Sequence, residues 1–190
     1  MITNLPPLPP VPPVPPVQPG IYLPPNGILS AGLVMGSDDM SLLIERFTRS
    51  PYSHALLILP DGSLWESAPG KGVQHLPSFA AAYGDQKVDV FQMPLSDAQT
   101  AAILAFCQSR NGTPYAWKGD AAFVTGGGMG DPDPGSLFCS EFVFAAFQAA
   151  PIDLLANIPA WLVPPAALAY PTPPWRKVAA LNQASFTSLQ

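Results

Sequence analysis

The stretch of sequence that decides the fold is SHALLILPDGSLWES, residues 53–67. Its first seven residues form an apolar run that ends in turn residues, which indicates a β-strand, and residues 63–67 indicate a returning strand. Between them, Pro60-Asp61-Gly62 suits a three-residue hairpin loop, with Pro and Asp in a type I turn and Gly in the left-handed position. The stretch therefore predicts an antiparallel β-hairpin.

The length of this loop sets the register of the hairpin. A three-residue loop pairs Leu56 with Glu66, which places His54 and Glu66 on one face as diagonal neighbours. A two-residue Asp-Gly turn would shift the register by one and put them on opposite faces. That turn is disfavoured because Pro60 would then be a pairing residue without an N–H donor. We therefore expect Glu66 to lie within reach of His54 and to orient its ring; the alternative is a solvated strand glutamate.

Elements outside the hairpin are predicted from apolar periodicity and capping residues. The best-defined element is a helix over residues 97–110, because Ser96 and Gln99 form a capping box and Asn111-Gly112 is a stop signal. Helices packed on a mostly antiparallel sheet would make this an α+β domain. The other features are an apolar run at 28–35, helices over 40–47 and 138–149, and strands over 73–76 and 88–93.

Cys139 points most directly to chemistry. It stands at the start of the helix predicted over 138–149, after a Gly-rich loop at 126–135. At a helix N-terminus the free N–H groups and the helix dipole favour a thiolate, and the same N–H groups can bind a developing oxyanion. The alternative is that Cys139 is a small apolar residue on a buried stripe, which is our interpretation of Cys107.

A thiolate nucleophile needs a base, and the chain contains only two histidines, His54 and His75. His54 opens the predicted strand, where it is either the base or an ordinary half-buried residue. His75 has no obvious partner nearby in the sequence, and we interpret it as a surface residue. The chain has no His-x-x-x-His, Cys-x-x-Cys or Gly-x-Ser-x-Gly spacing, so the sequence predicts neither a metal site nor a serine hydrolase.

The charge of the chain excludes a nucleic-acid binder. The net charge is -5 and only eight residues are Lys or Arg, too few for a basic face that neutralises phosphates. The uncharged stretch 154–175 is long enough to cross a membrane, but its six prolines would disrupt a helix. The first charged residue is Asp38, so no secretory signal with a basic start is visible. We expect a protein that is cytoplasmic or exported by a route without such a signal.

The 26 prolines are unevenly distributed. Residues 5–17 read LPPLPPVPPVPPV, and an x-Pro-Pro repeat of this kind is expected to form a solvated polyproline II rod. Such a rod either binds an aromatic groove of a protein partner or serves as a stiff spacer. We therefore predict a Pro-rich tail over residues 1–27 and one folded domain over residues 28–190. The second Pro-rich stretch, 151–174, should wrap the surface of that domain.

Three motifs in order resemble a known family. They are Ser41 to Ile58, which contains Pro51-Tyr-Ser-His54; Leu64-Trp-Glu-Ser67, followed by Gly72-Val73; and Gly112-Thr-Pro-Tyr115, followed by Phe138-Cys-Ser-Glu-Phe-Val143. Together they resemble the circularly permuted papain-like amidases, the YiiX/YebB-like branch of the NlpC cell-wall peptidase superfamily. In that family the strand that carries His precedes the helix that carries Cys. The resemblance covers roughly residues 27–177 and leaves out the Pro-rich N-terminus.

The resemblance implies a permuted papain-like fold and a thiol hydrolase that needs no cofactor and no metal. It assigns Cys139 as nucleophile, His54 as general base and Glu66 as orienting residue, acting through an acyl-enzyme on an amide such as a peptidoglycan peptide. Glu141 also matches a family position, and we interpret it as structural. Lipid-directed thiol acyltransferases or esterases share the permuted order, but usually have a second His where this chain has Glu66. A non-catalytic binding module that recruits a partner through residues 5–17 is a third possibility.

Overall fold

The computed structural model describes residues 22–36, 49–117, 135–170 and 173–187. Its centre is a six-stranded antiparallel sheet with the strand order β4-β3-β2-β1-β5-β6. The strands are β1 (Ser30–Met35), β2 (His54–Ile58), β3 (Leu64–Ala68), β4 (Gly72–Leu76), β5 (Lys87–Gln92) and β6 (Arg176–Leu181). The α-helices of the described ranges are α2 (Phe79–Tyr83), α3 (Asp97–Arg110), α5 (Cys139–Ala149) and α6 (Gln183–Thr187). The fold is therefore α+β, as predicted.

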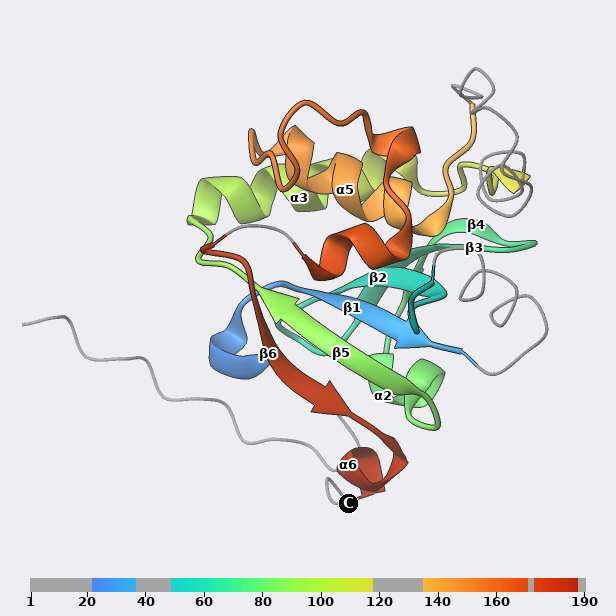
Figure 1. Cartoon of the computed structure of the whole chain (residues 1–190), viewed down its shortest axis with the longest axis vertical. Coiled ribbons are helices and arrows are strands. Elements are labelled where there is room, and N and C mark those ends of the chain that lie inside the picture. Colours follow the sequence, from blue (N-terminus) through green and yellow to red (C-terminus); the bar gives the residue numbers. More distant parts are fainter. Residues whose placement is uncertain (1–21, 37–48, 118–134, 171–172, 188–190) are drawn as a thin grey trace, which may run out of the picture.

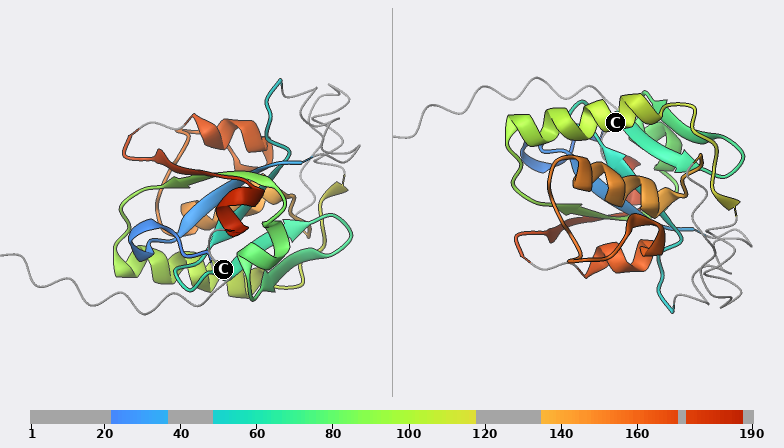
Figure 2. Two further views of the ribbon diagram at one scale, coloured as in Figure 1. Left: turned by 90° about the horizontal axis from the view of Figure 1, so that it is seen from below. Right: turned by 90° about the horizontal axis from the view of Figure 1, so that it is seen from above.

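The helices cover both faces of the sheet. α3 and α5 lie side by side over one face, and α2 lies against the other (Figure 1). The right-hand view of Figure 2, taken from above, shows α3 and α5 in front of the strands. No helix in the described ranges combines the length and the apolar character that a bilayer span requires.

The two faces of the sheet bury different cores, because successive side chains of a strand point in opposite directions. In β2, Ala55 and Leu57 belong to the larger core, which lies beneath α3 and α5. Leu56 and Ile58 belong to the smaller core on the α2 side. Burial on both faces explains why β2 is a continuous apolar run. His54, two residues before Leu56, shares its face and points toward α2.

The predicted hairpin is confirmed together with its register. Leu56 lies opposite Glu66, and the Leu59 N–H donates to the Ser63 carbonyl over 2.8 Å. Gly62 has φ +83°, the left-handed conformation that the third loop position requires. The loop length therefore brings His54 and Glu66 to the same face, as the three-residue turn predicts.

The long helix also agrees with its sequence signals. α3 has the predicted limits, and its capping box is reciprocal: the Gln99 N–H donates to Ser96 Oγ over 3.2 Å, and the Ser96 N–H donates to Gln99 Oε1 over 2.9 Å. Cys107 on this helix is fully buried, which confirms its assignment to the core. α5 begins at Cys139, one residue after the predicted start.

The second Pro-rich stretch packs over α5. It contains two short 3-10 helices, Ala160–Leu162 and Pro165–Ala169. The Ser140 hydroxyl on α5 donates to the Val163 carbonyl over 2.7 Å, and the Trp175 indole N–H donates to the Leu168 carbonyl over 2.9 Å. The described part of this stretch up to residue 170 therefore packs onto α5 through its two 3-10 helices.

Several elements were not predicted. The apolar run at 28–35 becomes β1, one of the two central strands, while α2 and β6 lie where no element was expected. α2 has only five residues, too few for helical periodicity to show. The predicted helix over 40–47 and most of the predicted tail lie outside the described residues. Folded structure extends further toward the N-terminus than residue 28, because Tyr22 is buried against Phe79, with ring centroids 5.4 Å apart.

Candidate active site

His54 stands at the first position of β2, where backbone and side-chain bonds fix it. Val34 of β1 lies opposite His54. The preceding Ser53 donates its N–H to the Val34 carbonyl over 2.9 Å and accepts a bond from the Gly36 N–H on its Oγ over 3.0 Å. The imidazole is 15% exposed. The ring is therefore held at an end of the sheet while one side remains open to solvent.

Glu66 lies next to His54 on β3, as predicted, and is almost completely buried. Its Oε2 lies 2.8 Å from His54 Nε2 and also accepts a bond from the Tyr83 hydroxyl. Its Oε1 accepts a bond from the Gln74 amide over 2.8 Å. Gln74 lies directly opposite Glu66 on β4. Three donors therefore satisfy a carboxylate that burial would otherwise disfavour.

Cys139 is the first residue of α5, and its side chain hydrogen-bonds to the His54 ring. The loop before Cys139 is tied to β3, because the Ser67 hydroxyl donates to the Leu137 carbonyl over 2.6 Å. Cys139 is 1% exposed, so the site opens to solvent on the side of His54.

A second set of backbone bonds connects this loop to β4. The Val73 N–H donates to the Thr113 carbonyl, and the Gly112 N–H donates to the Val73 carbonyl, each over 2.8 Å. The Leu137 N–H then donates to the Pro114 carbonyl over 3.0 Å. Residues 112–114 thus bridge the sheet and the start of α5, so that the same strands that carry Glu66 and Gln74 also position the cysteine.

Contacts among Cys139, His54 and Glu66 shift the pKa values of His54 and Glu66. Burial of the imidazole disfavours its protonated form, but Cys139 and Glu66 outweigh burial and raise the pKa of His54 to about 10. Burial also disfavours the Glu66 carboxylate, but His54, Tyr83 and Gln74 lower the pKa of Glu66 to about 2. Near neutral pH, His54 is therefore an imidazolium and Glu66 a carboxylate.

The surroundings of Cys107 and Glu141 fit structural roles for both residues. Burial raises the pKa of Cys107 to about 12, so its side chain stays a neutral thiol in the core. Burial also raises the pKa of Glu141 to about 7, against the effect of the Phe138 N–H. That N–H donates to Glu141 Oε2 over 3.2 Å. Glu141 therefore caps the start of α5, beside Cys139.

The structure brings together all three residues that the sequence singled out, and it adds two. His75 is exposed, as expected, and its ring contacts Trp65 and the Ser63 hydroxyl. Gln74 and Tyr83 were missed. The short turn between residues 67 and 72 would have predicted Gln74 opposite Glu66, whereas no sequence signal indicates Tyr83, which lies on the short α2.

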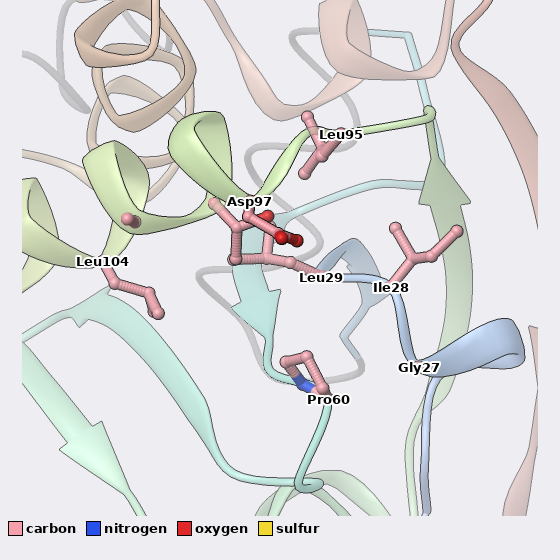
Figure 3. A pocket seen from close by; sticks show the side chains of 9 residues that line it. Gly27, Ile28, Leu29, Pro60, Leu95, Asp97 and Leu104 are labelled. Atoms are coloured by element: carbon pink, nitrogen blue, oxygen red, sulfur yellow. The ribbon is translucent and has the colours of Figure 1, made fainter. Parts of the chain in front are cut away.

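A separate pocket of about 500 Å³ lies at the other end of β2. Figure 3 shows Pro60, Leu95 and the Asp97 carboxylate around it, together with the segment that leads into β1. The length of β2 and the turn residue after it separates this pocket from His54 by roughly 20 Å. It is therefore not part of the site around Cys139.

The described side chains around Cys139 that could ligate a metal ion are not arranged around a common point. Cys139 bonds to His54, and His54 bonds to Glu66, so the three groups form a linear chain. Across the described ranges, no group of three or more His, Cys, Asp or Glu side chains is arranged to hold a metal ion.

Comparisons with known proteins agree with the fold. No family model matches the chain, and no curated protein matches its sequence. Among solved structures, the crystal structure of the metalloprotein YiiX from Escherichia coli O157:H7, of DUF1105, matches with a TM-score of 0.59. It is 16% identical in sequence, and the match covers 82% of this chain and 97% of that chain. The description as a metalloprotein applies to YiiX. At this identity the likeness shows a shared fold, that of YiiX.

Proposed function

We propose that the chain is a thiol hydrolase of the permuted papain-like type that cleaves an amide through Cys139, His54 and Glu66. One observation carries the proposal: a single imidazole is bonded on one side to a cysteine at a helix N-terminus and on the other to a buried carboxylate. This arrangement supports a nucleophile, a proton carrier and an orienting group. The fold shared with YiiX and the order of the His strand before the Cys helix agree with it.

The proposed reaction begins from a thiolate–imidazolium pair. The Cys139 thiolate attacks the amide carbonyl carbon, and the carbonyl electrons move onto oxygen, where the free N–H groups at the start of α5 stabilise the charge. The tetrahedral intermediate collapses as His54 donates its proton to the amide nitrogen, so the C–N bond breaks and the amine leaves. The product of this half-reaction is a thioester on Cys139.

Water completes the cycle. Neutral His54 takes a proton from a water molecule, whose oxygen attacks the thioester carbonyl. The C–S bond then breaks, which releases the carboxylic acid and restores the thiolate–imidazolium pair. Glu66 keeps the ring oriented and stabilises its positive charge in both halves. Atoms and electrons balance without a further reactant.

The substrate we propose is a peptide amide, for example in peptidoglycan. The permuted relatives that act on lipid esters usually have a second histidine at the position of Glu66, so the carboxylate favours an amide substrate. Trp117 is half-exposed and contacts Tyr115, which pairs with Leu137 just before Cys139. An exposed aromatic side chain in this region favours an acyl group with an apolar part. Lipid esters are therefore the second candidate substrate class.

The test incubates the full chain with muropeptides and, separately, with lipid esters, and follows release of amine and of alcohol. Mass spectrometry of the quenched reaction looks for an acyl group on the peptide that contains Cys139. Cys139→Ala should abolish turnover by at least roughly 10³-fold, as loss of a nucleophile does, while Cys107→Ala should retain it. Cleavage of lipid esters alone would replace the amidase by an esterase. Turnover that persists in Cys139→Ala, or none with either class, would contradict the proposal.

A further inference from the structure

The two carboxylate oxygens of Glu66 accept different numbers of hydrogen bonds. Oε1 accepts a single bond, from Gln74. Oε2 accepts two, from His54 and from the Tyr83 hydroxyl. Since Glu66 is 2% exposed, bulk water does not compete for these positions. Tyr83 and His54 therefore share one oxygen of the carboxylate that holds the ring.

Tyr83 also contacts the imidazole itself. Its ring lies parallel to that of His54, with centroids 5.9 Å apart and an interplanar angle of 15°. Tyr83 thus contacts both Glu66 and His54, through its hydroxyl on the carboxylate and its ring on the imidazole. Burial and the charge of Glu66 raise the pKa of Tyr83 far above its usual value, so its hydroxyl remains a donor.

α2 is anchored so that Tyr83 has little freedom. Ser78 caps the helix by accepting a bond from the Ala81 N–H over 3.2 Å, and the Phe79 N–H donates to the Gly62 carbonyl over 2.8 Å. Phe79 is fully buried and stacks on Tyr83 four residues later, with ring centroids 6.0 Å apart. This i,i+4 pair fixes the direction of the tyrosine ring. In Figure 1, α2 lies on the face of the sheet opposite α5, so the site is held from both faces.

We propose that Tyr83 is a positioning residue that limits how strongly Glu66 holds the His54 imidazolium, by occupying part of the same carboxylate oxygen. The inference rests on the proposed function of the Cys139–His54 pair. Two donors on one oxygen weaken each other, because each withdraws electron density from the acceptor. Tyr83 therefore makes the imidazolium a better proton donor than an unshared Glu66 would allow, which suits the step in which the amide nitrogen receives the proton.

Within the described ranges, the titratable groups that face the His54 ring come from three elements. They are Cys139 from α5, Glu66 from β3 and Tyr83 from α2. Tyr83→Phe keeps the stacked ring and the contact with Phe79, and removes only the hydroxyl. Gln74→Leu is the matched control, because it removes a donor from the same carboxylate at the oxygen that His54 does not use.

The experiment is an NMR titration of the histidine rings in the full chain, from pH 6 to 11. Relative to the unsubstituted protein, Tyr83→Phe should raise the pH at which His54 loses its proton by roughly half to one pH unit, since the freed oxygen strengthens a charged hydrogen bond. Gln74→Leu should change it less.

The outcomes separate this inference from the proposed function. No shift or a downward shift in Tyr83→Phe would overturn the role of Tyr83, as would equal shifts in Tyr83→Phe and Gln74→Leu. If His54 of the unsubstituted protein titrates at its ordinary value and does not respond to Cys139→Ala, the proposed function itself fails. Chemical-shift dispersion of the two variants establishes that each is folded, so an absent shift is interpretable.

Discussion

Replacing Gly72 by alanine should weaken the connection between the sheet and the start of α5. Gly72 has φ +75°, and a Cβ at this position would lie 2.2 Å from the Thr113 carbonyl oxygen. That oxygen belongs to the backbone and accepts the Val73 N–H, so it cannot move without breaking this bond. Gly70 is the matched control, because it has φ +73° and a Cβ there would meet no atom within 4 Å.

Comparing Gly72→Ala with Gly70→Ala separates the cost of a left-handed alanine from the cost of the clash with Thr113. A left-handed alanine costs about 1–2 kcal/mol at either position. Gly72→Ala also loses the Val73–Thr113 bond, a further 0.5–1.5 kcal/mol or so, and leaves the N–H of the buried Val73 partly unsatisfied. We therefore expect a loss in unfolding free energy of about 2–4 kcal/mol for Gly72→Ala and about 1–2 kcal/mol for Gly70→Ala. Urea unfolding at constant m-value measures both. Equal losses would refute the role of residues 112–114 as a bridge.

Two further predictions concern the same site. Ser67→Ala removes the hydrogen bond to the Leu137 carbonyl. It should lower the unfolding free energy by about 0.5–1.5 kcal/mol and slow alkylation of Cys139. The control is Ser63→Ala, which removes a hydroxyl that bonds to Asp61 at the far end of the hairpin and should lower stability without slowing alkylation of Cys139. The stability of the protein should also depend on pH in both directions. The contribution of Glu66, whose pKa is lowered from 4.5 to about 2, is complete above pH 4.5 and lost as pH falls through 2. That of His54, whose pKa is raised from 6.5 to about 10, is complete below pH 6.5 and lost as pH rises through 10. Urea unfolding of the protein and of Glu66→Gln should be measured across this pH range. In the variant, the losses of unfolding free energy at low pH and at high pH should both be smaller. Unchanged losses would contradict the ion pair of His54 and Glu66.

The local part of the site could be predicted from the sequence because it depends on short-range rules. The three-residue turn Pro60-Asp61-Gly62 sets the register of β2 and β3, and that register alone places Glu66 beside His54. The start of α5 at Cys139 follows from the change from a Gly-rich loop to an apolar helical pattern. The capping box and the Asn111-Gly112 stop define the limits of α3 for the same reason, since each signal lies within one turn of a helix end.

The remaining part depends on contacts between distant segments, which no local pattern contains. β1 is one of the two central strands of the sheet, yet its sequence is an apolar run that fits a strand or a buried helix equally well. Tyr83 lies on a helix of five residues and reaches Glu66 only because Phe79 is buried against the sheet. The bridge through residues 112–114 consists of backbone hydrogen bonds, which side-chain identities do not predict. The one sequence feature that relates to the bridge is Gly72, which lies against the Thr113 carbonyl.

The most direct test of the account is alkylation by iodoacetamide at pH 6, with the modified cysteine identified by mass spectrometry. Cys107 is fully buried, and burial raises its pKa to about 12, so it serves as an internal control. We predict selective modification of Cys139, slowed roughly 10²-fold or more by His54→Ala and unchanged by His75→Ala. Equal and slow modification of both cysteines, or a Cys139 rate that does not depend on His54, would contradict the catalytic pair.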